Sequence, residues 1–496
     1  MIDHAMPAPQ TGASRANFAG PISCLLIIMI ALASRGFRIG DPAIDMDEQF
    51  YLLVADRMWH GAMPYIDIWD RKPIGLFLIY AILRPLSSDG IIAYQIGALI
   101  AATATALVLR AIAKRYADDW GATLAAVAYL VYLPLVGGAG GQAPVFYNLP
   151  MAIGALLVLR AGEAKTPRNA SRAAFGAMMF AGLAIQVKYT AIFEGIAFGC
   201  WLLKIRLQQD RSLRRSCGFV LGFIATALTP TLVAALAYAA LGHFHAFFVA
   251  NFVSIFQVEG SRNLSSLPAM ARAGVVMAPL LTIAAWSALT RLNKGTQDQR
   301  AFILLWAAWA IFGFFALGNF YNHYALPLLT PLAILSAPLL AERRLSIPIM
   351  ALLGIWYSIG AGWSQDDITS RHQRQIAALA EAMAPYASTR CAYIYDGPTI
   401  LYLVTRACLV TPYIFPEHLN RASEAKPSRA TQAMGQLLAR RPGLILMPDK
   451  RLDHLPNLVT ETMLKRAITR DYQRTATLAD VYGRKQLVYV RKDLVH

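Results

Sequence analysis

The stretch "DMDEQFYLLVADRMWHG" (residues 45–61) lies just after the first strongly apolar segment of the chain. Its first four residues include three carboxylates, Asp45, Asp47 and Glu48, at a point where the chain would leave a lipid bilayer. Charge at this boundary is costly unless it reaches water, caps a helix or has a chemical task. The stretch therefore raises two questions: whether the chain spans a membrane, and whether these carboxylates have a chemical function.

The whole chain has the composition of a membrane protein. Of its 496 residues, 56% are hydrophobic and only 15% are charged, whereas a soluble domain carries about 25% charged residues. The apolar residues gather in segments of about 20, the length of a membrane-spanning helix. We predict an all-α polytopic protein with eleven spans, near residues 20–38, 91–110, 121–138, 144–160, 174–188, 190–203, 217–241, 268–290, 301–318, 322–341 and 345–362.

The formal net charge of +17 would suggest nucleic acid as a partner in a soluble protein. Here the basic residues gather in short links between apolar segments, as the positive-inside rule predicts for cytoplasmic loops. We therefore expect no nucleic-acid partner. We also expect the links 110–120, 160–173 and 204–216 to be cytoplasmic.

The composition changes after residue 362, where charged residues and prolines return. We predict a membrane domain over residues 1–362, with an external loop at 39–72, and a soluble α/β domain over residues 363–496, outside the cytoplasm. In the second domain, "CAYIYD" (391–396), "GLILMP" (443–448) and "KQLVYVRK" (485–492) favour strands, and helical periodicity marks residues 367–385, 428–441 and 456–470. Cys391 and Cys408 also lie there, and the sequence leaves open whether they form a disulfide.

The apolar segment "KPIGLFLIYAIL" (72–83) is not predicted to cross the membrane. The loop after the first span is external if the N-terminus is cytoplasmic, and residues 110–115 are cytoplasmic by their charge. The single crossing at 91–110 already joins these two sides. Residues 72–83 should therefore lie in the interface or dip into the membrane and return.

The opening stretch has the pattern of a capped helix. Asp45 with Glu48 three residues later resembles a capping box, and Gly61 favours the end of the helix. We predict an amphipathic helix through Trp59 along the external surface, which leaves Asp47 without a structural task. A carboxylate at the membrane boundary could instead serve as a general base, and the local sequence does not decide between these interpretations.

Three cations fall at predicted external ends of apolar segments: Lys72 in "IWDRKPIGLF" (68–77), Lys188 in "GLAIQVKYTAIFEG" (182–195) and His323 in "NFYNHYALPLLTP" (319–331). Two of them have an ordinary interpretation, since Lys72 could snorkel to the headgroups and His323 could be an interface residue. All three could also bind an anion. An enzyme that uses a lipid-linked phosphate ester needs such cations for the leaving phosphate and a base for the acceptor hydroxyl.

Residues 45–82 resemble the first-loop signature of the GT-C membrane glycosyltransferases. The resemblance is to the bacterial branch similar to protein O-mannosyltransferases and the lipid A aminoarabinose transferase. It is carried by Asp47-Glu48, Tyr51, Ala55, Gly61, Pro64-Tyr65 and Lys72-Pro73. The segments "GLAIQVKYTAI" (182–192) and "HYALPLLTPLAIL" (323–335) resemble two further motifs, so the resemblance covers roughly residues 20–362.

The resemblance implies an inverting transfer of a sugar from a polyprenyl-phosphate carrier to an envelope glycan, a lipid or another external hydroxyl. The reaction would take place at the outer face of a bacterial inner membrane, with the C-terminal domain in the periplasm. Asp47 would match the catalytic aspartate, with Glu48 beside it. The donor phosphate would be bound by Lys72, Lys188 and His323, and further donor or acceptor contacts could come from Tyr65, Asp70, Arg71 and Tyr324.

One departure from the family pattern concerns a metal. Many relatives have an acidic residue in the second external loop, whereas "GGAGGQAPVFYNLP" (137–150) has Gln142 and no carboxylate. We therefore predict that no metal or other cofactor is required.

Two alternative functions also fit a charged external site. One is a ligase or polymerase of envelope polysaccharide, and the other is a flippase or transporter of lipid-linked glycans. A transporter is expected to place charges near the membrane midplane, whereas the charges here fall at the external ends.

Overall fold

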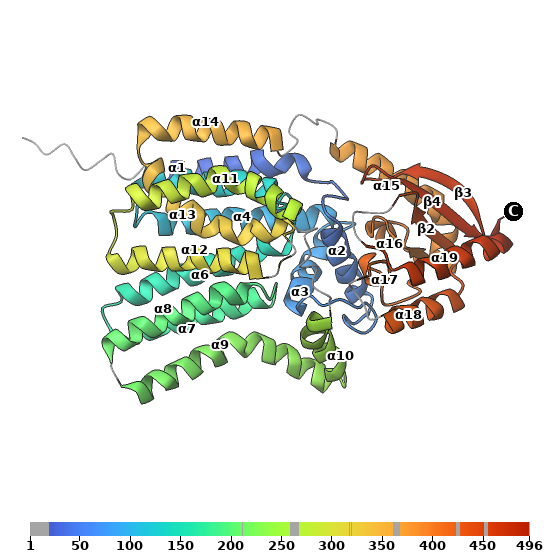
Figure 1. Cartoon of the computed structure of the whole chain (residues 1–496), viewed down its shortest axis with the longest axis horizontal. Helices are drawn as coiled ribbons and strands as arrows, with labels where there is room; N and C mark the ends of the chain where they lie inside the picture. The colour runs from blue at the N-terminus through green and yellow to red at the C-terminus, as the bar shows by residue number, and fades with distance from the viewer. Residues whose placement is uncertain are drawn as a thin grey trace, which may run out of the picture.

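The computed structural model describes residues 19–210, 212–257, 267–316, 318, 320–360, 368–422, 427–450 and 455–495. A bundle of long helices occupies one end of the molecule, and a mixed α/β region occupies the other (Figure 1). The predicted boundary between the two parts, at residues 362 and 363, lies outside the described residues.

Each of the eleven predicted spans overlaps a helix, and the helical bundle confirms the predicted fold class. The bundle consists of α1 (Ala19–Arg35), α4 (Ile91–Ala113), α5 (Asp119–Leu135), α6 (Ala143–Glu163), α7 (Pro167–Ile185), α8 (Ala191–Gln209), α9 (Leu213–Ala240), α11 (Leu267–Thr290), α12 (Gln297–Ala316), α13 (Leu329–Leu340) after the 3₁₀ helix η6 (Asn322–Leu328), and α14 (Arg343–Gly360). Among the described residues, seven helical segments are long and apolar enough to cross a membrane by themselves.

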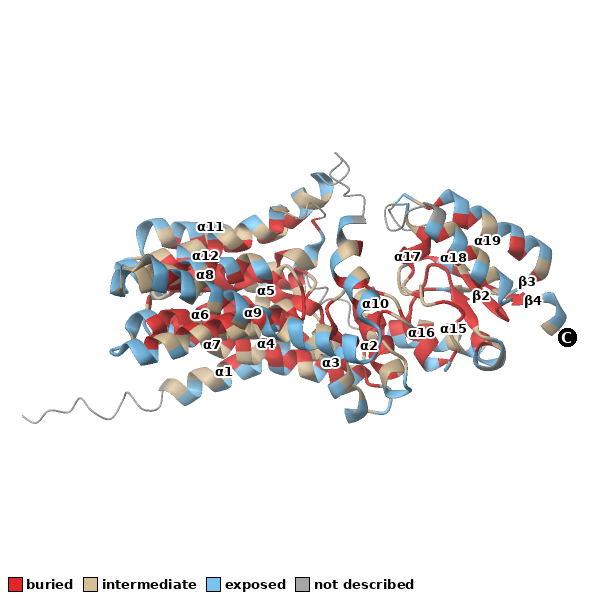
Figure 2. Ribbon diagram, turned by 90° about the horizontal axis from the view of Figure 1, so that it is seen from below, coloured by how far each residue is buried: buried red, intermediate tan, exposed pale blue. Residues whose placement is uncertain are grey.

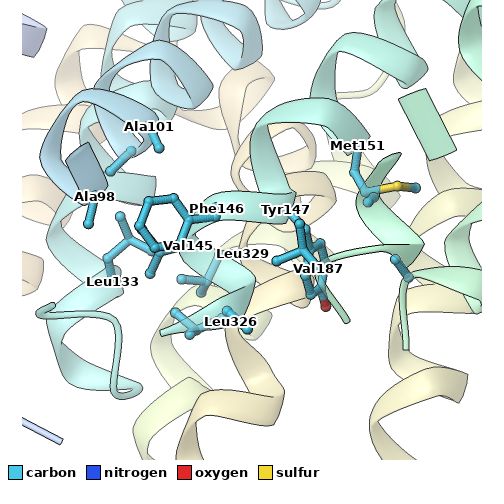
Figure 3. Close-up of a cluster of buried hydrophobic side chains, with 14 of the residues drawn as sticks. Ala98, Ala101, Leu133, Val145, Phe146, Tyr147, Met151, Val187, Leu326 and Leu329 are labelled. Carbon is cyan, nitrogen blue, oxygen red and sulfur yellow. The ribbon is translucent and has the colours of Figure 1, made fainter. Parts of the chain in front are cut away.

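Small residues let the helices of the bundle approach closely. A methyl group on Gly121 of α5 would lie 2.5 Å from the carbonyl oxygen of Ala337 in α13, and one on Gly182 of α7 would overlap the backbone of Ala227 in α9. Larger apolar side chains fill the remaining space, as in the cluster around Phe146 and Leu329 (Figure 3). Helix packing therefore depends on particular glycine and alanine positions.

The basic links lie at the end of the bundle that is remote from the α/β region (Figure 1). Ion pairs tie successive links together there, namely Arg115–Glu163 at 2.6 Å, Lys204–Asp298 at 2.7 Å and Arg291–Glu342 at 3.0 Å. The links 110–120, 160–173 and 204–216 thus share one end, as the charge pattern predicts.

Two short helices, α2 (Met46–Trp59) and α3 (Ile74–Leu83), lie between the bundle and the α/β region. Helix α3 has ten residues and is about 15 Å long, too short for a hydrocarbon core of about 30 Å. This agrees with the prediction that residues 72–83 do not cross.

The prediction of an amphipathic surface helix at α2 was wrong. Residues Glu48–Asp56 are all buried, because α2 lies between the bundle and the α/β region (Figure 2) and Arg84 pairs with Asp56 at 2.9 Å. Gln49 donates to the Tyr482 hydroxyl at 3.1 Å, and Arg57 donates to the Ala407 carbonyl at 2.7 Å.

The α/β region is built on a four-stranded sheet in the order β1-β2-β4-β3. Strand β1 (Ala392–Ile394) is parallel to β2 (Leu444–Pro448), whereas β4 (Lys485–Arg491) is antiparallel to both β2 and β3 (Tyr472–Ala479). The three predicted strands are confirmed. Strand β3 was not predicted, because this edge strand is mostly exposed and its sequence, "YQRTATLA", has few large apolar residues.

The helices of this region include the three predicted ones, α15 (Ile368–Arg390), α18 (Pro427–Ala439) and α19 (Leu458–Asp471). Cys391 and Cys408 form a disulfide. The remaining short elements are α16 (Ile400–Val404), α17 (Glu417–Asn420), α10 (Phe244–Phe248), the π-helix η3 (Val249–Val253), and the 3₁₀ helices η1 (Gly36–Arg38), η2 (Arg84–Leu86), η4 (Ser254–Gln257) and η7 (Lys492–Leu494).

Candidate active site

Two aspartates and one amide form the centre of the candidate site. Asp45 is the N-cap of α2, and its Oδ1 accepts a hydrogen bond from the Asp47 backbone amide at 2.9 Å. Gln142, from the link between α5 and α6, donates through Nε2 to Asp45 Oδ1 at 2.8 Å and to Asp47 Oδ2 at 3.3 Å. The capping role of Asp45 therefore leaves the Asp47 carboxylate available for other contacts, as the sequence suggests.

Lys72 approaches Asp47 from the segment that precedes α3. Its Nζ lies 3.9 Å from Asp47 Oδ2 and 5.3 Å from the centre of the Tyr51 ring. The Tyr65 hydroxyl donates to the Lys72 carbonyl at 2.8 Å, and Tyr65 itself is buried with a positive φ of 71°. Tyr65 thus fixes the backbone that carries Lys72.

Lys188 and His323 complete the cluster. Lys188 lies in the link between α7 and α8, with its Nζ 4.3 Å from the centre of the Tyr324 ring. His323 lies in η6, where its ring is 4.9 Å from that of Tyr324 and stacks 5.7 Å from Tyr321. Both residues are close enough to Asp47 to affect its ionisation. Four separate segments of the chain therefore bring Asp47, Lys72, Lys188 and His323 together.

The two aspartates have opposite pKa shifts. Burial raises the pKa of Asp45 to about 7, and the charge of Asp47 contributes to the rise. Burial also opposes the ionisation of Asp47, but Lys72, His323 and Lys188 together outweigh it and hold the Asp47 pKa at about 2. At neutral pH, Asp47 is thus fully ionised, whereas Asp45 is only partly ionised.

Glu48 points away from the cluster toward the 137–142 link. It is fully buried against Gly140 and Gly141, and burial with the nearby charge of Asp45 raises its pKa to about 8. Arg35 holds the same link by donating to the carbonyls of Gly138 and Gly140. This placement favours a supporting role for Glu48, whose predicted catalytic role stays a prediction.

Asp70 and Arg71 lie on the side of the site that faces the α/β region. Asp70 is buried and accepts a hydrogen bond from the Arg71 amide at 2.6 Å. Burial raises the Asp70 pKa, against the opposing effect of Lys72. The Arg71 guanidinium lies 5.5 Å from the centre of the Trp69 ring. The predicted contacts of Asp70 and Arg71 with the donor or acceptor stay a prediction.

A small hollow adjoins the cluster. It is lined by residues of α6, the α7–α8 link, α8, α12 and η6, namely Pro144, Tyr147, Lys188, Thr190, Phe193, Glu194, Ala310, Gly313, Phe314, His323, Tyr324 and Pro327. Lys188 and His323, which also influence the ionisation of Asp47, thus line one side of the hollow.

The structure adds two residues that the sequence predictions did not include in the site. Gln142 was noted only as a departure from the family, and it bridges the two aspartates. Glu194 was not singled out, although a carboxylate within an apolar segment is itself a signal. Within the described ranges, no group of three or more His, Cys, Asp or Glu residues could hold a metal ion.

Comparison with known proteins identifies the fold. A model of the family described as dolichyl-phosphate-mannose-protein mannosyltransferase matches residues 71–234, about a third of the chain. ArnT from Cupriavidus metallidurans, bound to undecaprenyl phosphate, aligns with a TM-score of 0.64 over 96% of this chain and 98% of that chain, at 14% identity. The chain has a GT-C fold. No curated protein sequence matches it significantly.

Two further solved structures extend the comparison. ArnT from the same organism in the apo state gives a TM-score of 0.62 at 15% identity, covering 96% of this chain and 99% of that chain. The Archaeoglobus fulgidus oligosaccharyltransferase in the apo form gives a TM-score of 0.50 at 11% identity, covering 88% and 70%. These similarities show that this multi-pass membrane protein shares the GT-C fold.

Proposed function

We propose that the protein is an inverting glycosyltransferase that moves a sugar from a polyprenyl-phosphate carrier to a hydroxyl of an envelope glycan or lipid. The observation that carries this proposal is the convergence of one ionised aspartate, Asp47, with Lys72, Lys188 and His323 at one end of the bundle. The similar ArnT structure contains undecaprenyl phosphate. A transporter is less well supported, because this cluster lies at the end of the bundle.

The reaction is a single displacement at the anomeric carbon of the sugar. Asp47 accepts the proton of the acceptor hydroxyl, and the acceptor oxygen forms a bond to the anomeric carbon. The bond from that carbon to the phosphate oxygen breaks, and its electron pair leaves with the lipid phosphate. Attack from the face opposite the phosphate inverts the configuration.

The cations stabilise the transition state more than the bound donor. The donor is a phosphodiester with one negative charge, and the leaving lipid phosphate gains a second as the bond breaks. Lys72, Lys188 and His323 lie together beside Asp47, so the attraction of the lysines and a hydrogen bond from the His323 ring strengthen as this charge develops.

Donor binding should also make Asp47 a stronger base. In the site without donor, the cations hold the Asp47 pKa at about 2, which makes the carboxylate a weak proton acceptor. A bound phosphate offsets part of their charge, so the Asp47 pKa rises toward the range in which a base is effective. Proton removal from the acceptor is thereby coupled to the presence of the donor.

We further propose that transfer requires no metal. The Gln142 amide nitrogen donates to both aspartates and thus takes the position that a bridging cation would occupy. EDTA should therefore leave the transfer rate of the purified protein unchanged. A loss of activity in EDTA that manganese or magnesium restores would contradict this.

We place the reaction at the outer face of a bacterial inner membrane, with the α/β region in the periplasm. The basic links at the opposite end suit a cytoplasmic location, and the Cys391–Cys408 disulfide suits an oxidising compartment. Mass analysis of the lipids and glycans of a deletion strain tests the function. We expect one envelope sugar to disappear and its polyprenyl-phosphate form to accumulate, whereas an unchanged envelope would overturn the proposal.

A further inference from the structure

The hollow beside the phosphate-binding cations contains a carboxylate that the proposed mechanism does not use. Glu194 lies in the first turn of α8, and its side chain is 2% exposed. Its Oε1 accepts a hydrogen bond from Trp306 Nε1 of α12 at 2.7 Å. Its Oε2 has no hydrogen-bond partner among the residues that the structure describes.

Within the described part of the chain, the surrounding residues leave one oxygen of the buried Glu194 carboxyl group without a hydrogen bond. Lys188 and His323 line the same hollow, but neither bonds to Glu194 Oε2. A buried carboxylate oxygen without a partner costs free energy, and an ionisable residue in such a place indicates a functional site. A ligand that donates a hydrogen bond to Oε2 would remove this cost.

The other lining residues indicate what kind of ligand fits. Phe193 and Phe314 provide flat apolar surfaces, while Tyr147 and Thr190 provide hydroxyls that lie 3.4 Å from each other. An isoprenyl chain would need only the apolar surfaces. A sugar ring presents both apolar faces and hydroxyl groups, so it matches the combination of aromatic rings, hydroxyls and one carboxylate.

We propose that this hollow holds the sugar of the donor, and that Glu194 Oε2 accepts a hydrogen bond from a hydroxyl or amino group on that sugar. The inference rests on the proposed function, because a phosphate held by Lys188 and His323 places its attached sugar at the mouth of the hollow. Glu194 is then a specificity-determining residue: it selects donors by the position and kind of one substituent.

The test measures binding to the full-length protein in lipid nanodiscs. The ligands are undecaprenyl phosphate and the same lipid carrying a neutral hexose, a neutral pentose or an amino-pentose. We expect at least one sugar-bearing lipid to bind the wild-type protein more tightly than the bare lipid. Glu194→Gln should lower the ratio of the affinities for sugar-bearing and bare lipid by at least about tenfold. The affinity for the bare lipid should not change.

Glu194→Gln separates recognition from a structural role. The glutamine keeps the volume of the side chain and an oxygen for Trp306 Nε1, so a purely structural glutamate would tolerate it. Its amide nitrogen replaces the accepting Oε2 with a donor. Glu194→Asp withdraws the carboxylate by one methylene and should also lose the preference, so it serves as a second variant if Glu194→Gln does not fold.

The outcomes distinguish the sources of failure. Equal sugar preference in the wild type and both variants, or no preference in the wild type, would overturn the assignment of Glu194. A parallel loss for bare and sugar-bearing lipids would also overturn it and assign the hollow to the lipid chain. A larger loss for the amino-pentose than for the neutral sugars would identify an amino group as the partner. Glu194-dependent binding without transfer to any acceptor would reject the proposed function and leave this inference standing.

Discussion

Replacing Asp47 with asparagine is expected to lower sugar transfer by about 10²–10⁴-fold, the usual contribution of a general base. Asparagine is nearly isosteric with aspartate and can still contact Gln142, so the protein should fold and bind the donor normally. It cannot accept the proton of the acceptor hydroxyl. Transfer of radiolabelled sugar from its polyprenyl-phosphate carrier, measured with protein purified in detergent, provides the rate.

Asp45→Asn is the matched control for this prediction. Asp45 Oδ1 accepts both the Asp47 amide and Gln142 Nε2, and the asparagine oxygen can accept both as well. Asparagine and aspartate are also similar N-caps, so this variant should keep most of its activity. An inactive Asp45→Asn protein beside an active Asp47→Asn protein would reverse the assignment of the base.

The pH dependence of the two kinetic constants provides a further check on Asp47. Its pKa of about 2 without donor means that the carboxylate stays ionised as the pH falls through the neutral range. The acidic limb of kcat/KM for the donor should therefore not come from Asp47. Because bound phosphate raises the Asp47 pKa, kcat should fall at a higher pH than kcat/KM. The proposed coupling would be wrong if kcat and kcat/KM fell at the same acidic pH and both still did so in Asp47→Asn.

The bundle could be predicted from the sequence because local properties determine it. Segment length and hydropathy locate the spans, and the charge of the links indicates which ends lie together. The charge of the neighbouring links also predicted that the segment containing α3 does not cross the membrane. Each of these features depends on residues close in the chain, so no knowledge of distant contacts was needed.

The environment of α2 could not be predicted in the same way. Gln49 is buried by Tyr482, which lies 433 residues later in the chain, and Phe50 packs 5.1 Å from Phe415. A capping box also predicts that Glu48 turns back toward the start of its helix. Instead, the absence of a side chain at Gly140 leaves room for the Glu48 carboxylate beside that link.

The candidate site was partly accessible from sequence. The resemblance to GT-C enzymes brought Asp47, Lys72, Lys188 and His323 into one hypothesis, and the structure places them together. The sequence showed that Gln142 is not acidic, but only the folded chain shows its amide between two carboxylates. Glu194 was hidden because its apolar neighbours suggested an ordinary membrane span.

Replacing Lys72 with glutamine is expected to lower kcat by about 10²–10³-fold, the effect of removing one group that stabilises developing negative charge. The Lys72 side chain is only 25% exposed, and its Nζ lies 3.9 Å from Asp47. This position differs from that of a lysine that merely extends to the headgroups. The turnover rate should fall as well as the donor affinity, because the attraction grows as the phosphate leaves.

Two comparisons make the Lys72 prediction specific. Lys72→Arg keeps the charge and should retain part of the donor affinity, but the planar guanidinium differs in geometry and should not restore full turnover. Lys204→Gln removes a lysine that pairs with Asp298 at the opposite end of the bundle, so it should transfer sugar at the wild-type rate. If Lys72→Gln matched Lys204→Gln in a polyprenyl-phosphate-sugar assay, Lys72 would not bind the leaving phosphate. The donor assignment would then depend on Lys188 and His323 alone.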